Sequence, residues 1–481
     1  MELTTVIKRN EIYGRYLVAA KDLKPGELIL KECPLQVGPQ TQAMAMCFNC
    51  TLYMASERSC EVCGKALKCS VNCKGKLHTR EECDTLSRMI IKSEDFLKAP
   101  QIILPLRCLL LKQYDAKKWA EFLELESHLK ERKDSPIWFI HKEGVYDVLK
   151  KLNVDVDEEL VQTICGILDV NSFEVRPLFA ATTPQECLRG VYLKAALMAH
   201  DCTPNTHLSV DFTFEMTIRA NRFIPAGETI FYNYANGLQG SAERRKHLHV
   251  GKYFDCTCKR CGDGTELQSF LSSLICTSCK SLISCAEPLK DIYSSDWICG
   301  KCSKTIKGNL VENTINHSKE LINDYSNLQE AEGILEKLKV TLGPNHYIIL
   351  ELKQNMISLL GNYDGELEIK RKIALCEELI SVLRLLDFGD ISRHLGIALY
   401  ELHKAKSQLV YEAYNCNLVD VCQYLEGLQE AQNILKESMK HLLYEPKCSP
   451  EGKLAQRAMN DLRVLRGTSS DLERILTLDC A

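Results

Sequence analysis

Apolar and polar positions alternate in two separate parts of the chain, in the way that short β-strands require. Tyr16 to Ala20 alternates, residues 24–27 (Lys-Pro-Gly-Glu) have the composition of a turn, and Leu28 to Leu30 is apolar again. This order predicts a strand, a turn and a strand. His207 to Ile218 also alternates, and Thr229 to Tyr234 follows a second Pro-Ala-Gly-Glu turn. The pattern therefore predicts short strands near the N-terminus and again in the region 191–234.

Elsewhere the apolar spacing is helical. Residues 84–165 are predicted to be mostly helical, with a clear example around Trp119 to Leu125. After residue 310, five amphipathic stretches each predict a helix. These stretches are Leu328–Leu342, Ile348–Leu360, Glu366–Leu385, Ser392–Tyr414 and Val419–Leu442. Helices joined by short turns predict an antiparallel array similar to tetratricopeptide repeats, a typical scaffold or partner groove, although no clean repeat period is visible.

Length and charge limit the possible classes of protein. A chain of 481 residues is expected to form two to four domains. Its formal net charge of -4 gives no global basic field that would attract nucleic acid or an anionic membrane. The N-terminus lacks the apolar core of a signal peptide, and no apolar run approaches the roughly 20 residues of a membrane span. We therefore expect a soluble protein in a reducing compartment, where its 25 cysteines need an explanation other than disulfides.

The cysteine spacing supplies that explanation. A Cys-x2-Cys pair lets two thiolates bind one metal from a tight turn, and tetrahedral zinc needs two such half-sites. Residues 47–83 contain enough ligands for two zinc ions, and an interleaved pairing is expected. One set is Cys47, Cys50, Cys69 and Cys73, and the other is Cys60, Cys63, His78 and Cys83. The alternative is that these are buried or redox thiols, which three close pairs followed by a His/Cys pair disfavour.

Two later pairs have the spacing of a zinc ribbon, namely Cys276 with Cys279 and Cys299 with Cys302. Trp297 and Ile298, just before the second pair, favour a strand. Only two pairs support this site, and Cys285 is a competing ligand. The sequence predicts a ribbon here on weaker grounds than the first two sites.

Three separated motifs resemble one family. They are Gly14-Arg-Tyr-Leu-Val-Ala with the following Lys-Pro-Gly-Glu turn, Ala199-His-Asp-Cys-Thr-Pro-Asn205, and Gly227 to Tyr234 followed by Glu243-Arg-Arg-Lys and Cys256-x-Cys258-x2-Cys261. Together they resemble a SET domain, and the inserted cysteine cluster resembles a MYND zinc finger. With the helical C-terminal array, the chain is similar to the SET and MYND domain (SMYD) family, and most similar to its arthropod-type members.

This resemblance implies an α+β fold with small SET-type sheets, an inserted MYND finger, a post-SET zinc site, a zinc ribbon and an antiparallel, TPR-like helical array. The expected divisions follow the chain in order. They are 1–46 for the N-terminal part of the SET domain, 47–83 for the MYND finger, 84–170 for a helical insert, 171–249 for the C-terminal part of the SET domain, 250–265 for the post-SET zinc segment, 266–306 for the ribbon and 307–481 for the helical domain.

The resemblance also implies an activity, the methylation of a protein lysine by S-adenosylmethionine. Direct methyl transfer to an amine needs that amine deprotonated, aligned and screened from water. Tyr234 matches the family's catalytic tyrosine, and the cofactor pocket is expected to include the residues that match its motifs. These are Arg15, Asn171, Ala199, His200, Tyr234 and Phe254. Cys202, Cys256, Cys258 and Cys261 match the ligands of a third zinc ion, which makes three zinc ions and a fourth in the ribbon.

Single residues have simpler interpretations that only their joint matching outweighs. Tyr234 alone could be a core tyrosine, and His200 alone a hydrogen-bonded loop histidine. Three positions also depart from the family pattern. Ala199 replaces an asparagine that contacts the cofactor, Tyr16 replaces the second glycine of Gly-x-Gly, and Lys252 stands where the family has a second active-site tyrosine, with Tyr253 one step away.

These departures support a second hypothesis, a weak or inactive SET protein that binds partners. We place the enzyme first, acting on histone or other proteins in transcriptional regulation. MYND fingers of this family bind proline-rich corepressor peptides, so such peptides are candidate partners beside the protein substrate. Lysines and arginines in the finger form a solvated face, so direct DNA binding is not expected. The expected protein is a monomer of the cytoplasm and nucleus without a membrane partner.

Overall fold

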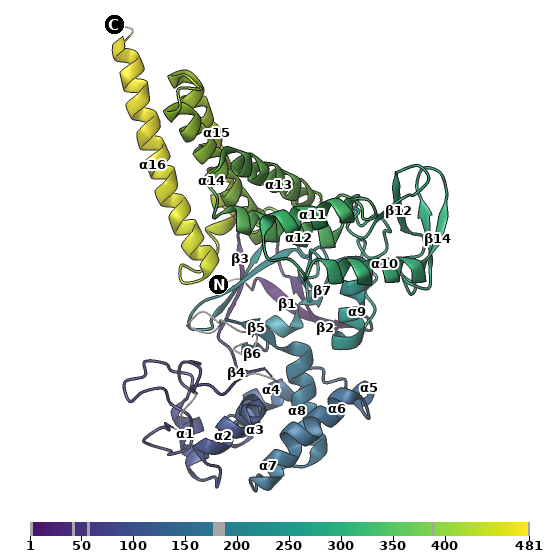
Figure 1. The fold of residues 1–481 in the computed structure, drawn as a ribbon. Coiled ribbons are helices and arrows are strands. Elements are labelled where there is room, and N and C mark those ends of the chain that lie inside the picture. The colour runs from purple at the N-terminus through teal and green to yellow at the C-terminus, as the bar shows by residue number, and fades with distance from the viewer. Residues whose placement is uncertain (1–2, 41–43, 55–57, 177–187, 387–388, 480–481) are drawn as a thin grey trace.

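The structure, a computed structural model, describes residues 3–40, 44–54, 58–176, 188–386 and 389–479. Figure 1 shows three layers, with the cysteine-rich loops and helices α1 to α8 at one end, small β-sheets in the middle and helices α10 to α16 at the other end. The long helix α16 carries the C-terminus at its tip, away from the sheets. None of the helices in the described ranges has the length and apolar content that a membrane crossing requires.

The central sheets join segments that lie far apart in the sequence. The strands are β1 (Thr5–Asn10), β2 (Gly14–Ala19), β3 (Leu28–Glu32), β4 (Gln36–Pro39), β5 (Phe173–Val175), β6 (Leu188–Val191), β7 (Ala199–His200), β8 (Thr206–Val210), β9 (Met216–Ala220) and β10 (Phe231–Tyr232). Strands pair in the orders β1-β2, β3-β9-β8, β4-β6-β5 and β10-β7. Among these pairs, β10 and β7 are parallel and the others are antiparallel. The first 40 residues therefore form one unit with residues 173–232, and the finger and helices are inserted between them.

The predicted strand, turn and strand near the N-terminus are present as β2 and β3. Gly14 begins β2 at φ 63°, a left-handed conformation that glycine adopts without a steric cost. The alternating stretch from His207 to Ile218 is divided into β8 and β9, because residues 211–215 turn the chain back. The Asp211 carboxylate accepts from the backbone N–H groups of Thr213 and Glu215, and Phe214 adopts φ 64° in this turn. Asp211 thus provides the turn chemistry that interrupts the alternation.

The inserted region is helical as predicted. Its helices are α1 (Arg80–Ser87), α2 (Ser93–Lys98), α3 (Ile103–Tyr114), α4 (Ala116–Leu123), α5 (Leu129–Arg132), α6 (Pro136–His141), α7 (Asp147–Lys151) and α8 (Glu158–Asn171). The buried helix α3 lies against β4, where a Cβ on Gly38 would be only 2.5 Å from the Cβ of Leu104. One continuous core connects the finger, these helices and the sheets.

The remaining chain forms a ribbon and a helical array. The ribbon strands β11 (Leu274–Ile275), β12 (Leu282–Cys285), β13 (Asp296–Cys299) and β14 (Thr305–Lys307) form an antiparallel sheet in chain order. The helices are α9 (Ser241–Lys252), α10 (Gly308–Leu321), α11 (Leu328–Lys339), α12 (Tyr347–Leu360), α13 (Glu366–Leu385), α14 (Arg393–Asn415), α15 (Val421–Leu442) and α16 (Pro450–Asp479). Five of these match the predicted stretches to within three residues, whereas α9, α10 and α16 were not individually predicted.

The helical array contacts the central sheets directly. The Arg393 guanidinium donates to the backbone carbonyl of Leu208 at 2.9 Å. Tyr444 lies so close to Gly26 that a Cβ there would be 2.5 Å from the tyrosine hydroxyl. Gly26 adopts φ 82°, so this position requires glycine for two reasons, its conformation and its neighbour.

Candidate metal centres and reaction site

Four groups of side chains could each hold a metal ion within the part of the chain that the structure describes. Three are the sets predicted from the spacing, and the third in chain order is the set that the family resemblance implied. They are Cys47, Cys50, Cys69 and Cys73; Cys60, Cys63, His78 and Cys83; Cys202, Cys256, Cys258 and Cys261; and Cys276, Cys279, Cys299 and Cys302. Within each set the ligand atoms all lie within 4.8 Å of one another. Tetrahedral zinc with Zn–S bonds of about 2.3 Å separates its sulfurs by slightly less than 4 Å, so each donor set fits that ion.

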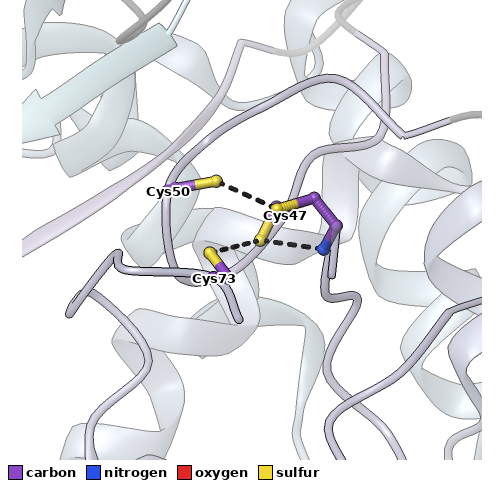
Figure 2. A group of neighbouring side chains, drawn as sticks. Cys47, Cys50 and Cys73 are labelled. Carbon is purple, nitrogen blue, oxygen red and sulfur yellow. Dashed lines mark hydrogen bonds between the residues drawn. The ribbon is translucent and has the colours of Figure 1, made fainter. Parts of the chain in front are cut away.

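In the first set of the finger, the sulfur atoms converge from three loops. Figure 2 shows the side chains of Cys47, Cys50 and Cys73 turned toward one another. The Sγ atoms of Cys47 and Cys73 are 3.9 Å apart, and those of Cys50 and Cys69 are 3.5 Å apart. The backbone N–H of Cys69 also donates to the sulfur of Cys47 at 3.3 Å. Such N–H donors stabilise a thiolate, which is the form that binds zinc.

The second set of the finger is supported by a buried ion pair. His78 presents Nε2 to the sulfur of Cys63 at 3.6 Å, while its Nδ1 lies 2.6 Å from the Glu82 carboxylate. The side chain of Arg107 donates to Glu82 at 2.6 Å and to the Val37 carbonyl at 2.8 Å, and both charged side chains are only 1% exposed. A carboxylate behind a histidine fixes the tautomer that leaves Nε2 free for a metal.

The third set joins the central sheet to the segment after α9. Cys202 follows β7, and its sulfur is 3.5 Å from that of Cys261. The guanidinium of Arg244 lies 3.4 Å from the Cys202 sulfur and also donates to the Glu266 carboxylate at 2.7 Å. Arg244 and Glu266 are fully buried, so a fixed positive charge faces these sulfurs. Such a charge stabilises a cluster of thiolates.

The fourth set lies on the ribbon. The sulfur of Cys276 is 3.6 Å from that of Cys302, and the sulfur of Cys279 is 3.5 Å from that of Cys299. Cys299 ends strand β13, as the strand prediction around Trp297 required. Cys285, the possible competitor, is buried on β12 and is outside this set.

Next to the third set, three rings form an aromatic cluster. The ring centroid of His200 is 5.2 Å from that of Tyr234 and 5.7 Å from that of Phe254. His200 Nδ1 accepts the backbone N–H of Tyr234 at 3.0 Å. The Tyr234 hydroxyl donates to the carbonyl of Met198, and burial raises the pKa of this hydroxyl above its ordinary value. Tyr234 is therefore a neutral donor at physiological pH, held by the segment around β7.

The other residues expected at a cofactor pocket make contacts of their own within the protein. Ala199 is buried on β7, and its N–H donates to the Ile230 carbonyl at 3.1 Å. The side-chain amide of Asn171, at the end of α8, donates to the carbonyls of Glu126 and Ile167 at 2.7 and 2.9 Å. Its Oδ1 is thus the atom left to accept from a ligand. The Arg15 guanidinium is held by the carbonyl and carboxylate of Glu124, at 2.6 and 2.5 Å.

Tyr16, which replaces a glycine of the expected motif, packs against a neighbouring tyrosine. Its ring centroid is 5.2 Å from that of Tyr13, and the Tyr13 ring is 6.0 Å from that of Phe231. On the two-residue strand β10, Phe231 points to the opposite face from Tyr232, and Tyr232 contacts Tyr234 with ring centroids 6.3 Å apart. The Tyr16 ring therefore packs against Tyr13, which in turn packs against Phe231.

Lys252 ends α9 beside the cluster. Its Nζ is 5.8 Å from the ring centroid of Tyr234 and donates to the backbone carbonyls of Asp169 and Val170, at 3.3 and 2.6 Å. Burial lowers the pKa of Lys252 to about 8. Tyr253, the next residue, turns the other way with φ 61°, and its ring is 4.8 Å from that of His128. The structure therefore places Lys252, rather than Tyr253, next to Tyr234.

Comparison with known proteins identifies the fold of this site. A sequence model described as "SET domain" matches residues 14–235. The protein is 25% identical over 407 residues to the SET domain-containing protein SmydA-8, isoform A, of Drosophila melanogaster, covering 80% of this chain and 85% of that protein. It is 28% identical over 267 residues to histone-lysine N-methyltransferase SMYD3 of Mus musculus, covering 52% of this chain and 59% of that protein. Residues 14–235 therefore match a SET domain, and the chain is similar to SET and MYND domain proteins.

The matched region includes His200 and Tyr234 of the aromatic cluster and the inserted finger, whereas Phe254 lies 19 residues beyond its end. The pattern analysis missed the charged residues behind the sulfur clusters, Glu82, Arg107, Arg244 and Glu266. One signal was available for Glu82, which stands four residues after His78 at the start of a helix and is thus on the same face. No local pattern indicates the role of Arg107, because its partner Glu82 lies 25 residues earlier in the chain.

Proposed function

We propose that this chain is a SET and MYND domain protein and an S-adenosylmethionine-dependent protein-lysine methyltransferase. The observation that carries the proposal is the meeting of His200, Tyr234 and Phe254 beside β7. His200 and Tyr234 lie inside the region that matches the SET domain. These are the residues that the family motifs assign to the reaction site. The mouse relative named above is itself called a histone-lysine N-methyltransferase, which supports the same reaction class here.

When bound, the cofactor would supply an electrophilic methyl group on a positively charged sulfur. The residues of the chain then have distinct roles. Phe254 offers an aromatic face for the adenine, and Asn171 offers Oδ1 as a hydrogen-bond acceptor. The buried Tyr234 hydroxyl, kept neutral by its raised pKa, orients the reacting lysine amine and the carbonyls around it. Burial of the cluster excludes water, which would otherwise solvate the amine.

The zinc sites have a structural role in this proposal. The third set, Cys202, Cys256, Cys258 and Cys261, would hold the segment that carries Phe254 against β7. The other three would stabilise the finger and the ribbon. We infer a substrate lysine in a histone or another protein, a role in transcriptional regulation, and a monomeric protein of the cytoplasm and nucleus.

Calorimetric titration of the zinc-replete protein with S-adenosylmethionine tests this proposal. We expect saturable binding to the wild type and to Tyr234→Phe, because the hydroxyl of Tyr234 bonds to the Met198 carbonyl within the protein. The wild type should transfer a labelled methyl group to proteins of an unfractionated extract, whereas Tyr234→Phe should bind the cofactor but not transfer the methyl group. An absence of heat at millimolar cofactor would contradict the enzyme proposal.

A second candidate function is supported by Ala199 and by the surface of the finger. The methyl side chain of Ala199 makes no hydrogen bond to a cofactor, and a buried polar group left unpaired costs about 1–3 kcal/mol. The finger exposes apolar side chains, with Val62 77% and Val71 74% accessible. Such side chains suit the binding of a proline-rich corepressor peptide. Capture of that peptide should be lost in Val62→Asp and Val71→Asp, and retention in both variants would contradict the binding role.

A further inference from the structure

The surroundings of the Lys252 amine suit its neutral form as well as its charged form. Its Nζ donates to two backbone carbonyls at the end of α8, those of Asp169 and Val170. A neutral amine has two N–H groups, whereas an ammonium has three. The two carbonyls therefore satisfy the neutral form fully. The remaining position on Nζ, either a lone pair or a third N–H, is the one that can face the Tyr234 ring, whose centroid is 5.8 Å away.

The charged groups around Lys252 do little to hold its proton. The one nearby carboxylate, Asp169, already lies 2.8 Å from the guanidinium groups of Arg132 and Arg189 and 2.7 Å from the imidazole of His141. Although burial opposes it, His141, Arg189 and Arg132 hold the pKa of Asp169 below its ordinary value, so this carboxylate is committed to its own partners. Burial is the largest effect on the pKa of Lys252 and lowers it, Asp169 opposes this, and Arg189 adds to the lowering.

The other titratable neighbours offer no compensating anion. Tyr234 stays neutral because burial raises its pKa, and His200 is hydrogen-bonded to the backbone N–H of Tyr234. On the other side, Tyr253 stacks with His128. Burial of the Lys252 side chain lowers its pKa to about 8, in agreement with this geometry.

Under the proposed function, a second positive charge, the sulfonium, binds next to Tyr234. Two like charges in a partly buried site disfavour each other, and the group that can release a proton does so. We propose that Lys252 distinguishes the charge state of the cofactor: its ammonium passes a proton to solvent when the sulfonium binds, and its amine takes the proton back when the neutral thioether product remains. No other bond changes in this step. The inference rests on the proposed function and adds a specificity-determining residue to it.

The consequence is a pH-linked preference between cofactor and product. Release of one proton makes the affinity for S-adenosylmethionine rise by up to about tenfold per pH unit below the pKa of Lys252, and the rise stops above that pKa. The affinity for S-adenosylhomocysteine, which carries no sulfonium, should stay level over the same range. At neutral pH the protein would therefore favour the product more strongly than it does in mild alkali.

The test is calorimetry of full-length, zinc-replete protein with each of the two ligands, in pairs of buffers with different ionisation heats. Near pH 7 we expect release of about one proton with S-adenosylmethionine and almost none with S-adenosylhomocysteine. Lys252→Met should abolish the proton release and the pH dependence. The matched control is Lys246→Met, an exposed lysine on the same helix, which should retain both.

A second measurement keeps the test decisive if Lys252→Met fails to fold. Lysine labelled with ¹³C at Cε reports the titration of Lys252 in the wild type, assigned by comparison with Lys252→Arg. A midpoint near the ordinary value of about 10.4 would overturn the inference without reference to the cofactor. Equal pH dependence for both ligands would also overturn it, while leaving the proposed function intact. Failure of either ligand to bind would contradict the proposed function itself.

Discussion

The imidazole of His200 links Cys202 to Tyr234. Its Nδ1 accepts the backbone N–H of Tyr234 at 3.0 Å, and its Nε2 lies 3.4 Å from the Cys202 sulfur. Because a neutral imidazole that accepts at Nδ1 carries its proton on Nε2, that N–H points to the sulfur. The third sulfur cluster therefore orients the ring that holds the tyrosine, and the metal centre and the reaction site form one connected unit.

A first prediction follows from this link and compares two cysteine variants. Cys261→Ser and Cys302→Ser each remove a sulfur from one of the four predicted sites, so each should lower the zinc content from four ions to three. Only Cys261→Ser should weaken S-adenosylmethionine binding, by about tenfold or more, because only that site contacts His200. Metal analysis and calorimetry measure the two quantities. Equal loss of cofactor affinity in both variants would show that the link through His200 is unimportant.

A second prediction concerns the carboxylate behind the finger. Glu82→Gln removes the charge that orients His78 and balances the buried guanidinium of Arg107. Breaking such a buried pair costs about 3–5 kcal/mol, and loss of a partner behind a metal ligand weakens metal binding by about 10–100-fold. Competitive zinc titration and urea unfolding should show both effects. Glu81→Gln changes the exposed neighbour on the same helix and should leave both quantities unaltered; a matching effect there would contradict the assignment.

Sequence patterns predicted the features that depend on residues close together in the chain. Cysteine spacing predicted three of the four ligand sets, the family resemblance implied the set that includes Cys202, and amphipathic spacing predicted α13 with its observed bounds, Glu366–Leu385. The roles of Tyr234 and the cofactor residues came from the family resemblance and stay predictions. Both the spacing and the motifs concern residues close together in the chain, which is why a sequence reveals them.

Contacts between distant segments could not be predicted in this way. The hydrogen-bond partners of the Lys252 amine are backbone carbonyls some 80 residues earlier in the chain, and no pattern within α9 indicates these contacts. The pairing of Arg244 with Glu266 behind the third sulfur set has the same origin, because it depends on how helix α9 meets the segment that follows it. The helix α16 was missed for another reason, since its polar composition and Gly467 weaken the amphipathic pattern.

A third prediction concerns acid stability at the contact between the helical array and the sheets. Glu445 is buried, 2.7 Å from Arg393 and 3.2 Å from His207 on β8. Burial by itself would raise the pKa of Glu445, but His207 and Arg393 outweigh it and hold the pKa below its ordinary value. A carboxyl with a lowered folded pKa contributes stability above its unfolded pKa of about 4.3, and that contribution is lost as the pH falls through the folded value.

Urea unfolding of the wild type and Glu445→Gln between about pH 7 and about pH 4 measures this contribution. The wild type should be the more stable at neutral pH, by about 1–3 kcal/mol, and the difference should shrink as the pH falls below about 4.5. Effects of acid on the metal sites are common to both proteins and cancel in the difference. Glu437→Gln, which removes an exposed partner of Arg384, should cost little at any pH. A difference independent of pH would exclude the carboxylate as its source.

A last prediction restores the family residue at the reaction site. Ala199→Asn supplies a side-chain amide where the buried alanine has none, beside His200 and on the strand that pairs with β10. If the missing hydrogen bond limits cofactor binding, the affinity for S-adenosylmethionine should rise by about tenfold, which corresponds to about 1.4 kcal/mol. Ala196→Asn, three residues earlier, is the control and should not change the affinity. Thermal unfolding of both variants separates a binding effect from a folding defect. A weaker or unchanged affinity in a folded Ala199→Asn protein would mean that the pocket is shaped around the alanine, and would favour the partner-binding role over catalysis.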